Sequence, residues 1–344
     1  MKVLIIDKNT RYVQRLTNAL QQKYAGRYEL YSITDLSRVV ERIREIHPDV
    51  VVADKDTAES DSEIIPFVSA YFVNNSDIEK INDKIAFCKY RSVDEIHQDI
   101  LTVLADASNK IVFRTESGDC DIIVFTSPAG GTGCSSLAGA YVVNRAKARK
   151  KTLFLTLDPY SDVELMFCGN GKNSMSELVY AIKSRSNNFA IKIETCLKKT
   201  STGICYFGTS KNALDILELT FEDKQFLLSG LKKSGLFDVI VLDIPFSIDR
   251  ESLKLLEDSR YVFWVNDGSR SCAKKIDRAY EALLIVGEKQ QSLSVTGVVN
   301  NKYIEDNSYV FPIKIPEFGK IPKIDDDNKG LDVLSELKFF DLVG

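Results

Sequence analysis

Residues 1–108 alternate between short apolar runs and segments whose apolar side chains recur every three or four positions. The runs have the length of strands and hold almost no polar residue, which is typical of strands buried on both faces of a parallel sheet. Helical spacing, as at Tyr12, Leu16, Ala19 and Leu20, indicates amphipathic helices. We expect strands at residues 2–6, 28–32, 48–54, 67–70 and 85–89, and helices at 36–46 and 92–107. This alternation predicts a doubly wound parallel sheet.

The same plan returns in the rest of the chain. Buried strands are expected at residues 122–125, 151–157, 203–207, 237–243, 260–266 and 293–301, and helices at 137–143, 175–182 and 331–342. Residues 109–120 have no clear period and end in turn-forming residues, so they are predicted to be a linker. A chain of 344 residues is long enough for two domains. We therefore expect an α/β protein with two open-sheet domains, at residues 1–108 and 121–344.

The composition excludes several classes of function. The net charge is -4, so no global basic field attracts nucleic acid or anionic lipid. The only histidines are His47 and His97, which excludes a histidine-dependent triad or a histidine-rich metal centre from the second domain. The seven cysteines are scattered without a Cys-x-x-Cys pair, as expected for free thiols in a reducing compartment. Without a signal peptide or a membrane-spanning run, we expect a cytoplasmic protein with no specific nucleic-acid binding and no direct membrane insertion.

A glycine-rich turn between the strand at 122–125 and the helix at 137–143 has the build of a phosphate-binding loop. Glycines let the backbone approach a phosphate, and the N–H groups and dipole of the following helix attract the anion. The candidate nucleotide-binding residues of this turn are Ala129, Gly130, Gly131, Thr132, Gly133, Cys134, Ser135 and Ser136. A loop of this kind normally carries a lysine, and Cys134 stands in its place.

In the first domain, polar residues are expected at the carboxyl ends of four strands: Asp7, Asp54, Ser69 and Lys89. This constellation resembles the receiver domain of response regulators, which has a flavodoxin-like fold. The resemblance implies a phosphoacceptor at Asp54 and a magnesium ligand at Asp7. It also implies a hydroxyl contact from Ser69 and a cationic partner at Lys89. Receivers carry a second acid where this chain has Lys8, and the segment before Ser69 is too short for the usual helix. We favour a non-signalling, protein-binding pseudo-receiver over the alternative, a response regulator phosphorylated at Asp54.

Four features of the second domain together resemble the MinD/ParA family of deviant P-loop ATPases: the glycine-rich turn, Asp158-Pro159, Asp243-Ile244-Pro245 and Asn300-Asn301. The resemblance implies ATP and Mg2+ as ligands. It makes Ser135 a magnesium ligand, Asp243 a magnesium contact through water, and Ser136 an α-phosphate contact. Asp158 would position the attacking water, and Asn301 would contact adenine.

Two lysines of that family's loop are missing. Ala129 replaces the lysine that reaches the partner's nucleotide across a dimer, and Cys134 replaces the lysine that neutralises β- and γ-phosphate charge. Losing one charge-assisted phosphate contact costs about 1.5–3 kcal/mol of binding, and losing it in the transition state costs more. We expect nucleotide binding with at most weak hydrolysis, unless a cation such as Arg270 or Lys274 restores the charge. A working ATPase that cycles between dimer and monomer is the alternative.

A receiver-like domain ahead of a MinD/ParA-like domain is the plan of the CpaE/TadZ proteins of type IVb (Tad/Flp) pilus systems. That resemblance implies a cytoplasmic homodimer at a cell pole, which recruits the pilus secretion ATPase and other pilus-assembly proteins through its receiver-like domain. MinD-like membrane binding is disfavoured because the C-terminal helix is acidic. ParA-like DNA binding is disfavoured because basic residues occur as isolated pairs such as Lys198-Lys199. The sequence therefore predicts an ATP-binding scaffold protein.

Overall fold

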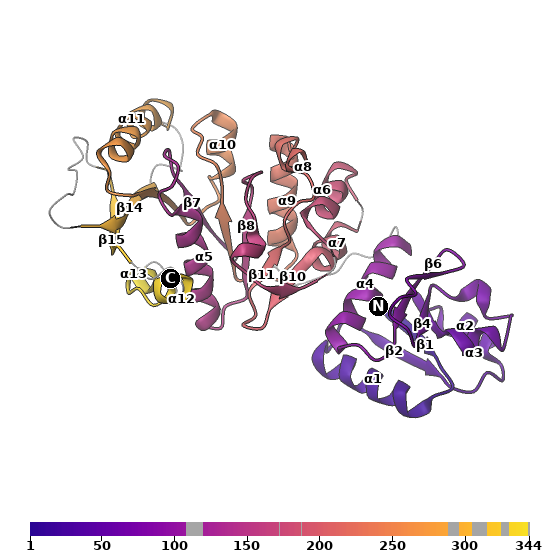
Figure 1. The fold of residues 1–344 in the computed structure, drawn as a ribbon. Coiled ribbons are helices and arrows are strands. Elements are labelled where there is room, and N and C mark those ends of the chain that lie inside the picture. The colour runs from indigo at the N-terminus through magenta and orange to yellow at the C-terminus, as the bar shows by residue number, and fades with distance from the viewer. Residues whose placement is uncertain are drawn as a thin grey trace. The chain divides into compact units, whose positions relative to one another are not determined.

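The computed structural model describes residues 1–107, 120–171, 173–186, 188–287, 296–304, 315–324 and 330–342. These residues form two compact units, each with its own sheet (Figure 1). The first unit comprises Met1–Val112 and Asn187–Thr195, and the second comprises Phe113–Ser186 and Cys196–Gly344. Of the predicted linker at 109–120, only Cys120 is among the described residues.

The described strands of the first unit form a six-stranded sheet in the order β2-β1-β3-β4-β6-β5. They are β1 (Lys2–Ile6), β2 (Glu29–Ile33), β3 (Val50–Asp54), β4 (Ala70–Val73), β5 (Lys80–Ile81) and β6 (Lys84–Cys88). All neighbours are parallel except β5 and β6. Asn82 and Asp83 join these two strands with positive φ at both positions, as a tight hairpin turn requires. The parallel strands have the order of flavodoxin-like sheets, so the fold class expected for this domain is confirmed.

Helices cover both faces of this first sheet. They are α1 (Thr10–Lys23), α2 (Val39–Ile46), α3 (Lys55–Glu59) and α4 (Val93–Ala107). α1 and α4 pack together, and Tyr12 of α1 meets Phe72 of β4 edge-on at 5.8 Å between ring centroids. Val39 of α2 and Ala58 of α3 join the opposite core around Leu4. Between β3 and β4 the chain forms only α3 and a 3-10 turn at Ile65–Phe67, so the reduced helix expected here is confirmed.

The strand expected at residues 67–70 is wrong in its position. β4 begins at Ala70, and the residues before it form the 3-10 turn, with Pro66 in its first positions. Proline has no N–H to donate to a ladder, which favours this turn over an earlier start of the strand. Ser69 therefore precedes β4 and lies at its amino end.

In the second unit, nine described strands form a sheet in the order β15-β14-β13-β7-β12-β8-β11-β10-β9. They are β7 (Asp121–Thr126), β8 (Thr152–Thr156), β9 (Gly169–Asn170), β10 (Leu197–Thr200), β11 (Cys205–Phe207), β12 (Val239–Asp243), β13 (Tyr261–Asn266), β14 (Thr296–Tyr303) and β15 (Glu317–Pro322). The strands are parallel except at one edge, where β10 is antiparallel to both β11 and β9. Strand β7 lies in the interior of the sheet between β12 and β13, so the loop that follows it opens away from both edges of the sheet.

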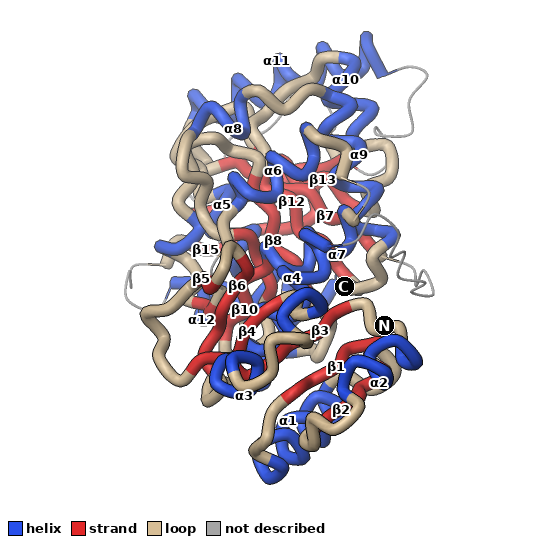
Figure 2. Tube along the Cα trace, turned by 90° about the vertical axis from the view of Figure 1, so that its right-hand side faces the viewer, coloured by secondary structure: helices blue, strands red, loops and turns tan. Residues whose placement is uncertain are grey.

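Helices also cover both faces of the second sheet (Figure 2). They are α5 (Cys134–Lys147), α6 (Met175–Lys183), α8 (Ala213–Leu217), α9 (Phe221–Lys233), α10 (Arg250–Leu255), α11 (Arg270–Gly287), α12 (Gly330–Ser335) and α13 (Phe339–Leu342), with a 3-10 turn at Val163–Leu165. Leu137 of α5 and Phe339 of α13 share one core with Phe125 of β7. Consecutive side chains of a strand point to opposite faces of the sheet, so Val124, which precedes Phe125 in β7, faces the helices on the other side. This side includes α9, whose Leu228 lies near Ile122, and α11, which contacts β13.

The C-terminal helix expected at residues 331–342 is wrong as a single element, because α12 and α13 divide it. Two side chains of α5 hold the carbonyl groups at this division. Asn144 donates to the carbonyl of Ser335 at 2.8 Å, and Arg145 donates to that of Phe340 at 2.7 Å. Because side chains of α5 supply hydrogen bonds to these carbonyl groups, the segment does not need a continuous helix to satisfy them.

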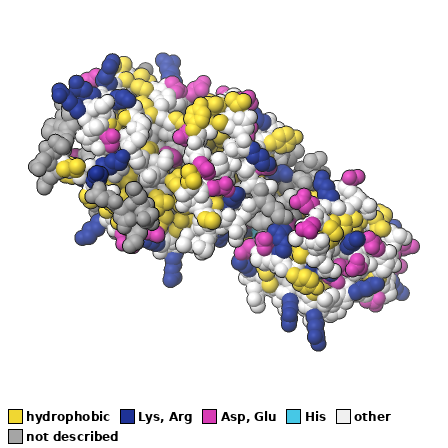
Figure 3. All heavy atoms as spheres, in the orientation of Figure 1, with side chains coloured by type: hydrophobic (Ala, Val, Ile, Leu, Met, Phe, Trp, Pro, Cys, Tyr) yellow, Lys and Arg dark blue, Asp and Glu magenta, His cyan; other side chains and the backbone are white. Residues whose placement is uncertain are grey.

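The last helix of the first unit comes from a distant part of the sequence. α7 (Phe189–Cys196) lies between α6 and β10 along the chain, yet Asn187–Thr195 belong to the first unit. None of the described helices combines the length and apolar character needed to cross a bilayer. On the visible surface of the second unit, Lys and Arg side chains are interspersed with Asp and Glu (Figure 3).

Candidate functional site

The glycine-rich loop connects β7 to α5 at the carboxyl edge of the second sheet. Gly131 and Gly133 have φ of +73° and +84°, a region in which side chains are strained and glycine is not. Gly133 is the N-terminal cap of α5, a helix of 14 residues, so the free N–H groups of its first turn face the loop. The predicted strand, turn and helix context is confirmed.

Asp243 ends β12, beside the ends of β7 and β8, and its carboxyl group lies next to the first turn of α5. Cys134 Sγ is 3.7 Å from Asp243 Oδ1, and Ser135 also hydrogen-bonds this carboxylate. Burial and, to a smaller degree, the negative charge of Asp158 raise the pKa of Asp243 to about 6, although the hydrogen bond from Ser135 opposes this shift. The structure thus brings four predicted site residues together: Cys134, Ser135, Asp158 and Asp243.

Three buried side-chain oxygens at this site have no hydrogen-bond partner among the described residues. They are Oδ2 of Asp243, Oγ1 of Thr132 and Oγ1 of Thr126, whose residues are 4%, 1% and 3% exposed. Buried polar atoms are normally satisfied, so unpartnered ones mark a place for a ligand, ion or water. A carboxylate and hydroxyls suit Mg2+, and backbone N–H groups suit phosphate. The residues present therefore fit the pair of ligands that the sequence predicts.

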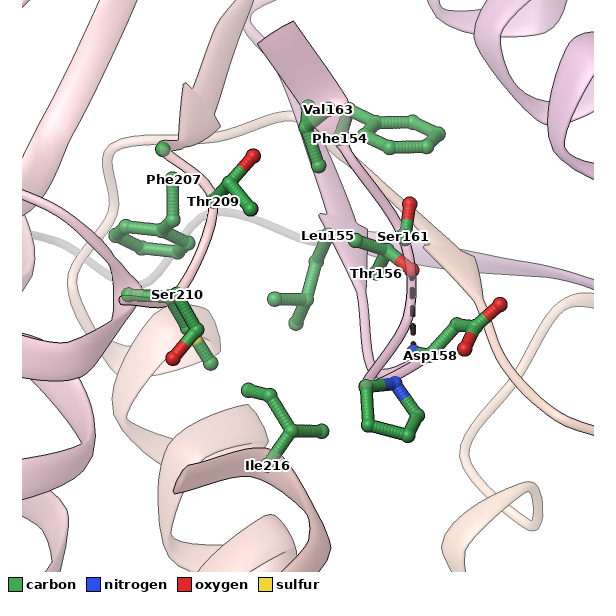
Figure 4. Close-up of a pocket in the computed structure, with 13 residues that line it drawn as sticks. Phe154, Leu155, Thr156, Asp158, Ser161, Val163, Phe207, Thr209, Ser210 and Ile216 are labelled. Atoms are coloured by element: carbon green, nitrogen blue, oxygen red, sulfur yellow. Dashed lines mark hydrogen bonds between the residues drawn. The ribbon is translucent and has the colours of Figure 1, made fainter. Parts of the chain in front are cut away.

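Asp158 follows β8, and its side chain forms a local turn with the backbone two residues further on. Its carboxylate accepts a hydrogen bond from the backbone N–H of Tyr160 at 2.9 Å, and its own N–H donates to Thr156 Oγ1 at 3.2 Å. A small pocket lies beside it, and in Figure 4 the carboxylate of Asp158 points away from the apolar side chains of Leu155 and Ile216. The carboxylate is thus separated from the apolar part of the pocket and acts electrostatically on Asp243.

Two consecutive residues of β14 contact the backbone of the loop. Asn301 Nδ2 donates to the carbonyl of Thr132 at 2.8 Å, and Lys302 Nζ donates to the carbonyl of Gly131 at 2.9 Å. A Cβ at Gly133 would lie 2.5 Å from Asn301 Nδ2, so only glycine fits beneath this amide. The structure places Asn301 against the loop itself, and its predicted contact with adenine stays a prediction.

Sequence reasoning missed Lys302. Arg270 and Lys274, the cations considered, are exposed residues at the start of α11. The available signal was the position of Lys302 directly after Asn301, in a strand whose carboxyl end was already assigned to the site. Its direction depends on the local backbone of β14, which the apolar pattern does not reveal.

Cys134 is not placed as a nucleophile. Burial, with the charge of Asp243 beside it, holds the pKa of this thiol well above its usual value. The thiolate is the reactive form of cysteine, so the protonated Cys134 serves as a loop residue.

In the first unit, three of the four predicted receiver residues form one buried cluster. Lys89 Nζ lies 2.8 Å from Asp7 Oδ2 and 2.6 Å from Asp54 Oδ1. Thr57 donates to Asp54 Oδ2 through its N–H at 3.0 Å and through its hydroxyl at 2.7 Å. Burial alone would raise the pKa of Asp54, but the hydrogen bonds from Lys89 and Thr57 outweigh it and leave the pKa below its usual value. Lys89 thus neutralises both acids.

Ser69 does not belong to this cluster, which corrects the prediction that it contacts a phosphoryl group. Its Oγ accepts a hydrogen bond from the N–H of Val51 at 3.1 Å, near the amino end of β3, whereas Asp54 is at the carboxyl end. Lys8 replaces the usual second acid and donates to Ser60 Oγ at 2.8 Å. Within the described ranges, no three His, Cys, Asp or Glu residues are grouped to hold a metal ion. The cluster therefore differs from the predicted receiver site in two ways: Ser69 does not supply its hydroxyl, and Lys8 stands where a second acid was expected.

Comparisons with known proteins agree with the two units. Residues 1–105 match the family model described as TadZ-like, receiver domain. A search of curated proteins found no match. The solved structures that resemble this chain include a ParA family ATPase from Chlorobium tepidum TLS, with a TM-score of 0.52 and 16% identity over 65% of this chain and 96% of that one.

They also include the septum site-determining protein MinD from Pyrococcus horikoshii OT3, complexed with Mg-ADP, with a TM-score of 0.49 and 16% identity over 65% of this chain and 94% of that one. At such identity, a likeness describes the fold. The chain thus carries a TadZ-like receiver domain followed by a MinD/ParA-like P-loop fold, and both predicted resemblances are confirmed.

Proposed function

We propose that this protein is an ATP-binding, homodimeric scaffold of a type IVb (Tad/Flp) pilus assembly system, with little or no ATP hydrolysis. The observation that carries the proposal is the loop between β7 and α5. It keeps glycines with positive φ and a helix N-terminus. In the part of the chain that the structure describes, a buried oxygen of Thr132 in the loop and one of Asp243 beside it have no hydrogen-bond partner. The loop lacks the two lysines of the family's loop, at Ala129 and Cys134. Groups that hold a nucleotide remain, and charges that drive its cleavage do not.

The backbone N–H groups around Gly131 and Gly133 would hold the phosphates of ATP, and Ser136 the α-phosphate. Ser135 and Asp243 would hold Mg2+, directly and through water, and Asn301 would contact adenine. A bound Mg2+ would neutralise part of the phosphate charge. With a pKa of about 6, Asp243 is mostly ionised at neutral pH, as a cation contact requires. Asp158 would position water in any residual hydrolysis.

The receiver-like unit would bind partners rather than accept a phosphoryl group. Its match to a TadZ-like receiver domain, ahead of a MinD/ParA-like fold, supports a CpaE/TadZ-type protein. In this proposal the unit recruits the pilus secretion ATPase and other pilus-assembly proteins, and the protein is cytoplasmic and located at a cell pole. The displaced Ser69 and the Lys89 bridge disfavour the alternative of a response regulator switched at Asp54.

A titration of the full chain with ATP and ADP, with and without Mg2+, tests the proposal when the mass of the complex is measured in parallel by light scattering. We expect ATP to bind with Mg2+ and to shift the protein toward a dimer. Asp243→Asn should weaken the magnesium-dependent part of binding, while the control Asp332→Asn, an exposed residue of α12, should not. Absence of binding at millimolar ATP would contradict the proposal.

A working ATPase remains the second candidate, because Asp158 and Asp243 are both present and electrostatically coupled. Steady-state phosphate release separates the two functions. Turnover at the rate of lysine-containing P-loop ATPases, abolished by Asp158→Ala, would favour the enzyme over the scaffold.

A further inference from the structure

The carboxyl end of β14 departs from a regular strand. Its pairing with β15 shifts register between Asn300 and Tyr303, and Lys302 has φ of +55°. Consecutive side chains of a regular strand point to opposite faces, and an irregularity of this kind redirects one of them. Here Asn301 and Lys302 both reach the loop, at the carbonyls of Thr132 and Gly131. The left-handed conformation is costly for a lysine, so this direction is maintained by the surrounding contacts.

The loop itself offers no cation to a nucleotide. Residues 127–136 contain neither lysine nor arginine. Two acids, Asp158 and Asp243, lie at the same edge of the sheet and raise the electrostatic cost of bringing in a polyphosphate. A positive charge on the loop would offset that cost, and Lys302 Nζ is placed 2.9 Å from the carbonyl of Gly131.

Lys302 can change its partner without moving the backbone. Its side chain is exposed and has four rotatable bonds, and its bond to Gly131 is to a neutral carbonyl. A phosphate oxygen carries negative charge and so attracts the ammonium electrostatically, which the neutral carbonyl does not do to the same degree. A phosphate held by the N–H groups of the loop would lie close to this carbonyl, so a rotation of the Lys302 side chain would bring the ammonium to the phosphate.

We propose that Lys302 supplies the positive charge that Ala129 and Cys134 have removed from the P-loop, by binding the phosphate groups of the nucleotide from the end of β14. The proposal rests on the proposed function, because it requires that the loop bind a nucleotide. It explains how a loop without lysine retains affinity for a polyanion. In this proposal the positive charge comes from a residue of β14, whereas the loop lysine of the family would stand at position 134, the first residue of α5.

A purely structural role for Lys302, as a clip on the loop, makes a different prediction. A clip would affect AMP, ADP and ATP equally, because the loop would be perturbed for all three. A phosphate contact would matter more as the number of phosphates grows, because the added negative charge is then what the ammonium binds.

The test is a binding titration of the full chain with AMP, ADP and ATP, comparing wild type, Lys302→Gln and Lys320→Gln. Glutamine can still donate a hydrogen bond to the carbonyl of Gly131, so the first variant removes mainly the charge. Lys320 on β15 is a matched control, since it contacts Tyr303 and Glu317 rather than the loop. We expect Lys302→Gln to weaken ATP binding about tenfold or more, in line with a lost charge-assisted contact. Its effect on AMP should be under about twofold, and Lys320→Gln should bind as wild type does.

A second background sharpens the test. Cys134→Lys restores the family's loop lysine, and in this background Lys302→Gln should cost less ATP affinity than it does in wild type. Equal losses for AMP and ATP, or an ATP affinity that Lys302→Gln leaves unchanged, would overturn the role of Lys302 and leave the proposed function standing. A folded wild type that binds no ATP at millimolar concentration would overturn both.

Discussion

At Asp243, the buried carboxylate proposed to contact Mg2+ is also one that lowers the stability of the ligand-free protein. This residue is 4% exposed, and one of its carboxylate oxygens has no hydrogen-bond partner among the described residues. Burial raises its pKa to about 6 from the usual 3.8. An acid whose pKa is raised by folding costs stability as the pH increases through the interval between the two values. In the ligand-free protein at neutral pH, the buried negative charge of Asp243 therefore lowers the free energy of unfolding, and a bound cation would offset this loss.

Asp243→Asn should stabilise the ligand-free protein, and more so at pH 7.5 than at pH 4. The gain at the higher pH is expected to approach roughly 3 kcal/mol, since each pKa unit corresponds to about 1.4 kcal/mol. Thermal or urea unfolding of the transition assigned to the second unit, at both pH values, measures the effect. An equal difference between variant and wild type at both pH values would contradict a raised pKa at this position.

Lys89 in the first unit is the converse case, a buried cation shared by two acids. Lys89→Ala should destabilise the protein by about 3–5 kcal/mol, because Asp7 and Asp54 would remain buried without their cation. The pKa of Asp54 is lowered in the native cluster, so wild-type stability from this group is lost as the pH falls. The deficit of the variant should therefore shrink at low pH. Urea unfolding checks this, with the exposed Lys80→Ala as control; a deficit that is constant with pH would contradict the ion cluster.

At the scale of elements, the apolar pattern predicted the strands that are buried on both faces, including β3, β7 and β12. The apolar pattern did not predict strands whose residues are only partly buried, because such strands have no continuous apolar run. β10 carries two lysines and lies near the edge of its sheet, and β15 follows a segment with no strong period, so neither was expected. The C-terminal helix has a continuous apolar pattern, but contacts from α5 divide it.

The residues of the candidate site could also be predicted only in part from the sequence. The loop and the strand-end acids were predictable because glycine spacing and buried strands position them. A shift of β4 by a few residues moved Ser69 to the wrong end of its strand, since a residue's edge of the sheet depends on where the strand ends. Lys302 was not predictable because an irregularity in β14 and one left-handed residue decide its direction.

α7 is the element whose position no local pattern suggests. It belongs to the first unit, where Glu194 forms an ion pair with Arg27 and lies 3.4 Å from His97 Nε2. His97 is 1% exposed, stacks on Tyr24 and contacts the hydroxyl of Tyr28. Burial alone would raise the pKa of Glu194, but hydrogen bonding to His97 and the charge of Arg27 lower it. These contacts attach α7 within the first unit.

Glu194→Ala should loosen α7 without unfolding the first sheet. Removing the carboxylate leaves Arg27 and His97 without their acid, at a cost of about 1.5–3 kcal/mol to the docked helix. Hydrogen exchange of the amides of residues 189–195 should accelerate tenfold or more, while amides of β1 and β3 stay protected. Glu29→Ala, which removes an exposed carboxylate of β2, is the control. Unchanged exchange in α7 would show that other contacts hold this helix.

At the scale of the molecule, a TadZ-like receiver domain and a MinD/ParA-like P-loop fold share one chain. The receiver cluster joins Asp7, Asp54 and Lys89, while Ser69 is bonded elsewhere and Lys8 follows Asp7 in place of an acid. The P-loop keeps its glycines and acids but lacks its lysines. We infer a protein whose two units recognise ligands and partners rather than transfer phosphoryl groups.

The proposed function requires that the protein hold ATP and cleave it slowly or not at all. The most direct measurement incubates wild-type protein, in excess, with γ-labelled ATP and Mg2+, and determines how much nucleotide is bound and how much label is released as phosphate. Most of the ATP should be recovered bound and intact after many minutes. Prompt conversion of the bound ATP to ADP and phosphate, dependent on Asp158, would contradict the account.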